Sequence, residues 1–322
     1  MSDSSRKKPL LVLVGPTAVG KTKFSLDIAR TFRAEIISGD SMQVYRGMDI
    51  GTAKVSPQER ALIPHHLIDI REPDEPFSVS DFQRLAKAAI DDIHSRGKLP
   101  FVVGGTGLYI EALCYDFHFS QAGMDQEFRE KQRKIAAEKG LSVLYNQLRE
   151  IDPEAAGRIH PNDERRIIRA LEVYHVTGQP FSAFFQKNRQ SPFDLLLIGL
   201  TMDRDLLYKR IEERVDQMME SGLVDEVKRL LANGCGRNLI SMQGLGYKEI
   251  AAYLYGECSL DEAVALLKRN TRRFAKRQLS WFRHMNEIHW VDVSETEKYT
   301  THLKQLSGII AGKFRHYEEY TE

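Results

Sequence analysis

Short apolar runs alternate with helical patterns along the first hundred residues. The helical patterns include Lys21–Phe32 and Ser80–Ser95, and the second is followed by Gly97, a common helix stop. Alternation of buried strands with helices predicts an α/β fold in which helices cover both faces of a parallel sheet. The expected strands are Leu10–Val14, Glu35–Ser38, Leu67–Ile70, Phe101–Val103, Leu195–Leu200 and Ile288–Val291.

The alternation stops near Asp116 and resumes near Phe193. Between these positions the helical patterns are Gln126–Glu138, Ser142–Arg149 and Asp163–Thr177. We therefore expect a core made of residues 1–115 and 193–322, interrupted by an all-helical insertion domain of residues 116–192. The last part of the core is expected to be mostly helical, over Asp205–Ser221, Leu223–Ala232, Tyr247–Tyr255 and Leu260–Met285.

Composition is that of an ordinary globular protein, with 322 residues, 42% hydrophobic and 28% charged. No apolar run approaches the length of a membrane span, and the first one is too short for a secretory signal. The three cysteines, Cys114, Cys235 and Cys258, are widely spaced and fit neither a disulfide framework nor a zinc site. We expect a cytoplasmic protein with no membrane partner.

Charge is balanced overall, with 46 Lys and Arg against 45 Asp and Glu, but it is uneven locally. The segment 268–284 contains seven basic residues and no acid. Six of them form two helical rows, and like charges on one face repel one another, so a polyanion partner is the better explanation of this face. The rows are Lys268, Arg272 and Lys276, and beside them Arg269, Arg273 and Arg277.

A phosphate-binding loop follows the first strand and opens the first helix. Its residues match G-x-x-x-x-G-K-[ST] in the required context. Backbone N–H groups of such a loop surround phosphate oxygens, Lys21 adds a charge, and the Thr22 hydroxyl is positioned for Mg²⁺. We therefore predict a phosphate or diphosphate ligand, with Mg²⁺ as cofactor, at Gly15, Pro16, Thr17, Ala18, Val19, Gly20, Lys21 and Thr22.

The acid that holds Mg²⁺ in nucleotide hydrolases is missing from its usual place. The strand Phe101–Val103 runs into Gly104–Gly107, where Thr106 offers a hydroxyl but no carboxylate occurs. Asp40 instead follows the strand Glu35–Ser38, at the sheet edge where ligands of α/β proteins bind. An isolated Asp-Ser is also a common turn or cap, so the phosphate loop upstream is what favours a functional Asp40.

Taken together, the motifs resemble the tRNA dimethylallyltransferase family, over nearly the whole chain and in the expected order. In that family a dimethylallyl group passes from dimethylallyl diphosphate to N6 of adenosine 37, which is flipped out of the anticodon stem-loop. The phosphate loop then holds a diphosphate leaving group, which accounts for the missing acid. The matching segments are Gly15–Thr22, Asp40–Gln43 with Tyr45, Gly51–Lys54, Pro64–Asp69, Val103–Tyr109, Arg158–Asp163, Arg169–Val173, Gly246–Glu249 and Thr271–Gln278.

The resemblance implies roles for individual residues. Asp40 is our choice of general base for the adenine amine, with Asp69 second. Thr106 and Arg210 are expected at the diphosphate, and Arg214, one helical turn away, is the rival of Arg210. The expected tRNA contacts are Asp40, Ser41, Met42, Gln43, Thr106, Arg129, Arg165, Arg166, Ile167, Ile168, Arg169, Arg272, Arg273, Lys276 and Arg277.

Two other functions remain open at this point. A small-molecule kinase would use the phosphate loop with Asp40 as base for a hydroxyl, and a nucleotide-regulated RNA-binding module would need no chemistry. The adjacent His65 and His66 point to opposite sides of an extended chain, so we interpret them as structural or substrate-lining rather than as a metal pair. We assign Trp281 and Trp290 to the core and expect a monomer.

Overall fold

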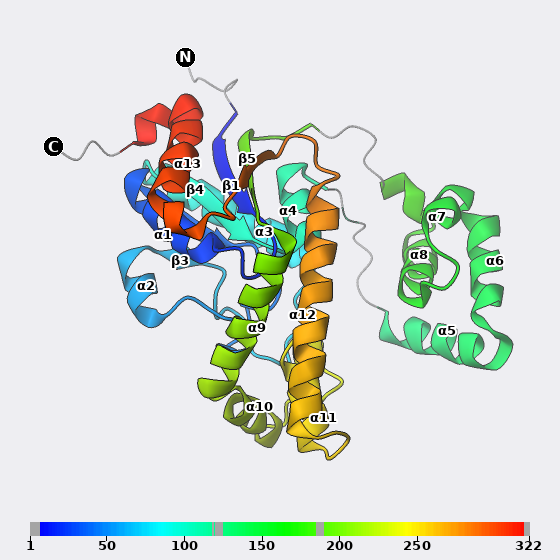
Figure 1. Cartoon of the computed structure of the whole chain (residues 1–322). Coiled ribbons are helices and arrows are strands. Elements are labelled where there is room, and N and C mark those ends of the chain that lie inside the picture. Colours follow the sequence, from blue (N-terminus) through cyan, green and yellow to red (C-terminus); the bar gives the residue numbers. More distant parts are fainter. Residues whose placement is uncertain (1–6, 118, 120–124, 185–189, 319–322) are drawn as a thin grey trace. The chain divides into compact units, whose positions relative to one another are not determined.

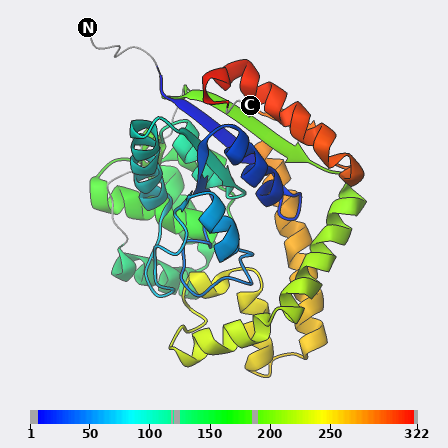
Figure 2. The same cartoon turned by 90° about the vertical axis from the view of Figure 1, so that its left-hand side faces the viewer.

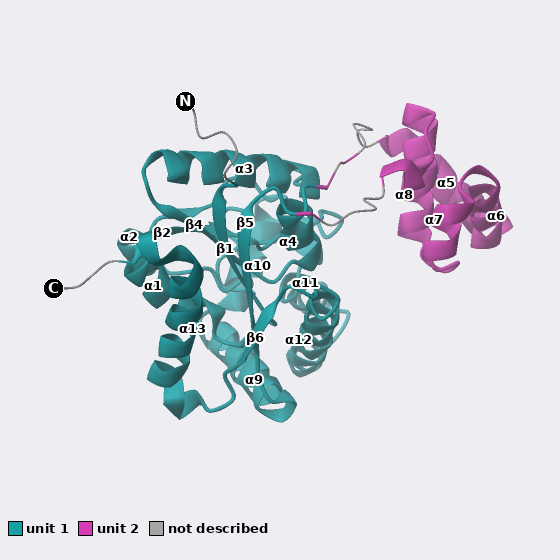
Figure 3. Ribbon diagram, turned by 90° about the horizontal axis from the view of Figure 1, so that it is seen from above, with its two compact units in different colours: residues 1–116, 191–322 teal, residues 117–190 magenta. Residues whose placement is uncertain are grey.

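The structure, a computed structural model, describes residues 7–117, 119, 125–184 and 190–318. The chain divides into two compact units (Figure 3). Unit 1 consists of residues 1–116 and 191–322, and unit 2 of residues 117–190. Each unit has its own core, and the two are described separately.

Unit 1 is built on a six-stranded parallel sheet with the strand order β3-β2-β4-β1-β5-β6 (Figure 1). The predicted α/β class is confirmed. Because β1 lies between β4 and β5, the loops after β1 and its neighbours meet at the carboxyl edge, where ligands of such sheets bind. The strands are β1 (Pro9–Val14), β2 (Ala34–Ser38), β3 (His65–His66), β4 (Leu99–Gly104), β5 (Asp194–Thr201) and β6 (His289–Asp292).

Helices cover both faces of the sheet (Figure 3). On one face, α1 (Lys21–Thr31) and α13 (Tyr299–Phe314) bury their apolar side chains against β1, β4 and β5. On the other face lie α3 (Val79–Ser95), which contacts β2 and β4, and α4 (Gly107–Cys114). The strands are thus covered by helices on both faces, as expected for strands that are continuous hydrophobic runs.

Four helices extend away from the sheet (Figures 1 and 2). The helices α9 (Arg204–Glu220) and α12 (Leu260–Phe282) run side by side, and α10 (Leu223–Ala232) and α11 (Tyr247–Leu254) pack at their far end. Ser259 caps α12 together with Glu262. The smaller helices of unit 1 are α2 (Pro57–Leu62), η2 (Ser241–Gln243), η3 (Thr296–Lys298) and η4 (Arg315–Tyr317).

In the described residues of unit 2, all regular secondary structure is helical. Asp125, Asp152 and Asp163 accept hydrogen bonds from backbone N–H groups and so cap three of its helices. Its core contains Leu144, Leu148 and Leu171 among other apolar residues. The elements are α5 (Gln126–Lys139), α6 (Leu141–Ile151), α7 (Pro153–Arg158), α8 (Glu164–Thr177) and η1 (Phe181–Phe184).

Two expectations about local structure were wrong, and one helix was missed. The predicted strand Leu67–Ile70 is a turn, because Leu67 and Asp69 have φ of 63° and 55°, and pairing with β2 ends at His66. Trp281 and Trp290 are half-buried rather than core residues. The helix α13 was not anticipated, although Leu306, Ile310 and Phe314 of it are fully buried.

Among the residues that the structure describes, every helix is too short or too polar to span a lipid bilayer.

Candidate functional site

Three loops meet at the carboxyl edge of the sheet, after β1, β2 and β4. Backbone hydrogen bonds join the last two: the Gly39 N–H donates to the Val103 carbonyl at 2.8 Å, and the Thr106 N–H donates to the Gly39 carbonyl at 3.3 Å. Residues of all three loops line one pocket of about 800 Å³, together with α9, α12 and the segment 49–60. This pocket is the candidate site.

The loop after β1 has the conformation of a phosphate cradle. A Cβ at Gly15 would lie 2.8 Å from the Leu200 carbonyl oxygen, so only glycine lets the loop turn this close to β5. The ammonium of Lys21 donates to the carbonyls of Gly15 (2.9 Å) and Pro16 (2.8 Å). Lys21 and Thr22 line the pocket along with Thr17, Ala18 and Gly20, whereas Val19 is buried in the core.

Two cations and one carboxylate interact at this end of the pocket. Burial, reinforced by repulsion from Arg214, lowers the pKa of Lys21 to about 7, while Asp40 acts in the opposite direction. Burial also lowers the pKa of Arg214, against the attraction of Asp40. Lys21, Arg214 and Asp40 therefore form one electrostatic cluster facing the pocket.

The structure distinguishes the two candidate arginines on α9. Both Arg210 and Arg214 line the pocket. The Arg210 guanidinium lies 3.9 Å from the Met202 sulfur, while Arg214 is the one whose charge acts on Lys21. The charge of Arg214 is thus coupled to the phosphate loop, while both arginines line the pocket and remain candidates for the diphosphate.

Asp40 and Thr106 organise the loop after β2. The Oδ1 atom of Asp40 accepts hydrogen bonds from the backbone N–H groups of Met42 (2.8 Å) and Gln43 (3.3 Å), and neither bond uses Oδ2. The Thr106 hydroxyl accepts a hydrogen bond from the Ser41 N–H at 3.1 Å. Asp40 lines the pocket, and Thr106 braces the loop that carries it.

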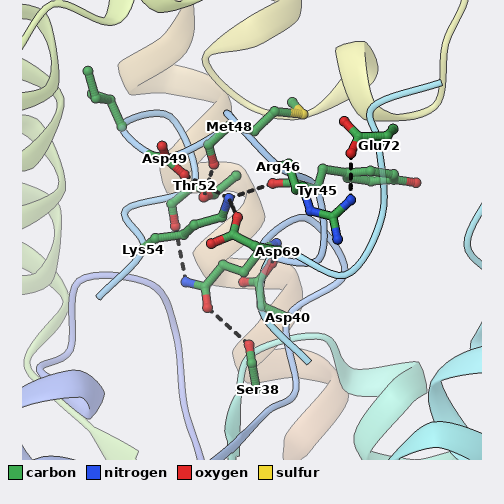
Figure 4. A network of polar contacts seen from close by, with 12 residues as sticks. Ser38, Asp40, Tyr45, Arg46, Met48, Asp49, Thr52, Lys54, Asp69 and Glu72 are labelled. Carbon is green, nitrogen blue, oxygen red and sulfur yellow. Dashed lines mark hydrogen bonds and ion pairs between the residues drawn. The ribbon is translucent and has the colours of Figure 1, made fainter. Parts of the chain in front are cut away.

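Gln43 and Lys54 bind the neighbouring polar groups, of which Figure 4 labels Ser38, Thr52 and Asp69. The Gln43 amide accepts from the Ser38 hydroxyl at 3.0 Å and donates to the Thr52 carbonyl at 3.2 Å. The ammonium of Lys54, buried in this network, reaches Asp69 at 2.5 Å.

Asp69, the second choice for a base, is already engaged. Besides Lys54 it pairs with Arg60 at 2.6 Å, and these two cations lower the pKa of its carboxyl although burial opposes them. Such a carboxylate is a poor proton acceptor, so Asp40 remains the better candidate.

The segment 49–51 is held by a carboxylate that sequence reasoning missed. Glu226 of α10 is buried and accepts hydrogen bonds from the N–H groups of Asp49, Ile50 and Gly51. The Tyr247 hydroxyl donates to the same carboxylate at 2.7 Å. A Cβ at Gly51 would lie 2.6 Å from the Tyr247 ring. In the sequence, only the family motifs Gly51–Lys54 and Gly246–Glu249 marked this region. Neither motif contains Glu226, so neither predicted its role.

The basic face of α12 is smaller than the sequence suggested. Lys268 pairs with Asp216 at 2.6 Å, and Arg272 pairs with Glu212, so α9 supplies acids that the run 268–284 lacks. This is a correction to the picture of six unopposed cations. The exposed basic residues are Arg269, Arg273, Lys276 and Arg277.

In unit 2 the predicted RNA contacts differ in exposure. Arg129 and Arg169 both bind the buried Glu172, at 2.7 and 2.6 Å. Ile167 and Ile168 are core residues of this unit, so their side chains offer no surface to RNA. Arg165 and Arg166 are exposed.

Metal ligands are sparse among the residues that the structure describes. They include no group of three or more His, Cys, Asp or Glu side chains able to hold a metal ion. The pocket lining offers oxygen groups of the kind that Mg²⁺ accepts beside substrate phosphates, namely the Thr22 hydroxyl and the carboxylates of Asp40, Asp49 and Glu213.

Comparisons with known proteins agree with one another. The family model described as IPP transferase matches residues 43–285, and one described as isopentenyl transferase matches residues 8–71. The tRNA dimethylallyltransferase of Geobacillus thermodenitrificans is 53% identical over 95% of this chain and 97% of its own length. That of Natranaerobius thermophilus is 54% identical over 91% and 89%.

Solved structures are similar as well. The full-length tRNA isopentenylpyrophosphate transferase of Bacillus halodurans is 48% identical, covers 97% of this chain and 98% of its own, and has a TM-score of 0.73. A eukaryotic dimethylallyltransferase acting on tRNA is 32% identical, covers 98% and 81%, and has a TM-score of 0.83.

Proposed function

We propose the following division of labour for the site residues of this chain, which belongs to the IPP transferase family of tRNA dimethylallyltransferases. The chain transfers a prenyl group to tRNA, and the known activity of its family modifies N6 of adenosine 37. The observation that carries our assignment is the cluster of Lys21, Arg214 and Asp40 in one pocket.

The donor is dimethylallyl diphosphate, and its diphosphate occupies the loop Gly15–Thr22. When the bond between the allylic C1 and oxygen breaks, its electron pair stays on the diphosphate. Backbone N–H groups of the loop, with Lys21 and Arg214, stabilise this charge where it develops. Donor binding also restores full protonation of Lys21, because a bound polyanion opposes the effects that lower its pKa.

The acceptor is the adenine amine, a weak nucleophile because its lone pair is delocalised into the ring. N6 forms the new bond to C1, and the proton that N6 loses passes to Asp40. The two backbone N–H bonds to Oδ1 fix the orientation of this carboxylate. We assign contacts with the flipped base and its neighbours to the adjacent Ser41, Met42 and Gln43.

The oxygen groups of the pocket fit Mg²⁺, which would neutralise charge on the diphosphate. The Thr22 hydroxyl would hold it, with the remaining ligands supplied by the diphosphate and water, as is usual for this ion. When bound, it neutralises charge on the leaving group.

The RNA lies on basic surfaces outside the pocket. We assign its phosphates to the exposed basic residues of α12 and, in unit 2, to Arg165 and Arg166. We propose that the enzyme acts as a monomer. Because tRNA is the acceptor, we place the enzyme in the cytoplasm.

The reaction is tested by weighing the RNA. The protein is incubated with dimethylallyl diphosphate, Mg²⁺ and an unmodified anticodon stem-loop carrying A36-A37, and a stem-loop with guanosine at position 37 serves as control. We expect a gain of one C5 prenyl unit on the first RNA only. ATP turnover without RNA would favour the kinase, and RNA binding without a mass gain would favour the binding module.

A further inference from the structure

A polar side chain interrupts the buried stripe of α12. Gln278 is 6% exposed, and both ends of its amide are used. Its Oε1 accepts a hydrogen bond from the Thr17 N–H of the phosphate loop at 2.9 Å. Its Nε2 donates to the Gly105 carbonyl, in the loop after β4, also at 2.9 Å. One side chain of a helix far along the sequence thus ties the two loops together.

The fit around this amide is tight. A Cβ at Gly105 would lie 2.2 Å from Nε2 of Gln278, and a Cβ at Gly107 would lie 2.5 Å from the Trp281 ring. Trp281 also donates to a Glu111 carboxylate oxygen at 3.0 Å. The loop Gly104–Gly107 therefore has glycines where two side chains of α12 are seated, which fixes the helix against it.

These contacts connect the two halves of the site. Thr17 belongs to the loop that we assign to the diphosphate. The loop containing Gly105 continues into Thr106, which holds Ser41, the residue after Asp40. A path of hydrogen bonds thus runs from the donor loop through Gln278 to the loop that carries the proposed base.

We propose that Gln278 is a positioning residue that sets the spacing between the diphosphate loop and the loop bearing Thr106, and hence between the donor and the attacking amine. The proposal rests on the proposed function for the identity of donor and acceptor. Gln278 acts through the backbone of the two loops. The exposed basic residues of α12 lie on other faces of the helix, so RNA binding does not depend on the amide.

Gln278→Met tests this, because it keeps the length of the side chain and removes both hydrogen bonds. Gln83→Met is the matched control: Gln83 is also buried in a helix of unit 1 and also donates to a carbonyl, that of Ala112 at 2.9 Å, but it lies away from the pocket. Thermal unfolding should change similarly in both variants. Only Gln278→Met should lower the single-turnover rate, by about tenfold to a hundredfold for two lost bonds in a positioning network.

Two further readouts separate positioning from a structural role. The KM for dimethylallyl diphosphate should rise in Gln278→Met, while the dissociation constant for the stem-loop stays within about twofold, since phosphate contacts dominate that affinity. Gly105→Ala introduces a methyl group that clashes with the Gln278 amide. It should lower the single-turnover rate much more in the wild-type background than in the Gln278→Ala background, where the smaller side chain removes the clash.

Native rates and donor KM in Gln278→Met, or equal losses in Gln278→Met and Gln83→Met, would overturn the proposal. Calorimetry of donor binding without RNA tests the role of Gln278 independently of the proposed function. A wild-type protein without prenyl transfer refutes the function, and the difference in donor affinity between wild type and Gln278→Met still decides the role of Gln278.

Discussion

The assignment of the diphosphate arginine leads to the sharpest prediction. Arg210 and Arg214 lie one turn apart on α9 and both line the pocket. Only Arg214 shares an electrostatic cluster with Lys21 and Asp40. Replacing each arginine separately by Met keeps much of the side-chain volume and removes the cation, so each variant is the control for the other.

The expected magnitude follows from what the diphosphate would lose. The loop N–H groups, Lys21 and one guanidinium stabilise its developing charge. Removing one such fixed electrostatic donor lowers kcat by about 10²–10³-fold. Arg214→Met should therefore slow single turnover about a hundredfold or more. Arg210→Met, whose guanidinium faces the Met202 sulfur, should remain within about threefold.

The assay is single turnover with excess enzyme, saturating dimethylallyl diphosphate and a labelled stem-loop. Calorimetry of the donor alone reports ground-state affinity, and gel shifts report RNA affinity, which should be unchanged in both variants. A hundredfold loss in Arg210→Met with a near-native Arg214→Met would refute the electrostatic argument and restore the assignment that the family resemblance implied.

Four further predictions concern the pocket, the core and the basic face of α12. Lys21→Ala should lower turnover by about two to three decades, the range for one electrostatic donor, and unchanged turnover would contradict the placement of the donor. Asp40→Asn keeps the hydrogen-bond geometry but cannot take a proton, so kcat should fall by about two to four decades with little change in RNA affinity; a near-native rate would leave Asp40 only a positioning role. Although burial opposes it, hydrogen bonds from the side chains of Arg96, Lys98 and His66 lower the pKa of the buried Glu35 from 4.5 to about 2. Because the folded pKa lies below the unfolded one, this stabilisation is complete above about pH 4.5 and disappears as pH falls towards 2, so urea unfolding should find Glu35→Gln less stable by about 2 kcal/mol at pH 7 and closer to wild type at pH 3. An equal difference at both pH values would contradict the linkage. Alanine at four positions of α12 should weaken RNA binding and flatten its salt dependence, and an unchanged slope would mean an ordinary solvated face. These positions are Arg269, Arg273, Lys276 and Arg277, the basic residues of α12 that α9 leaves exposed.

Local sequence signals were enough for the sheet and the phosphate loop. Apolar runs next to helical periodicity locate β1, β2, β4 and β5, because strands buried on both faces must be continuously hydrophobic. The glycine-rich loop was equally readable, since its conformation depends on its own residues. The edge strand could not be located in this way. Three of the four residues of Leu67–Ile70 are apolar, but positive φ at Leu67 and Asp69 turns the chain where Lys54 and Arg60 bind Asp69.

Residues that act through tertiary partners could not be located in this way. Glu226 is one acid among many in a helix until the fold brings Asp49, Ile50 and Gly51 to its carboxylate. Gln278 was part of a motif, yet its amide has a role only because α12 packs on the loop after β4.

The helix α9 explains why the basic segment of α12 was overestimated. One part of its surface presents Glu212 and Asp216, which pair with Arg272 and Lys268. Residues one turn apart on the same helix, Arg210 and Arg214, line the pocket. The acids and bases of α9 therefore have different roles. The acids neutralise the side of α12 that packs against α9, and the bases add positive potential at the diphosphate. A polyanion can then gain only from the cations of α12 that α9 leaves exposed, so charge counted along one helix overstates the charge available to RNA.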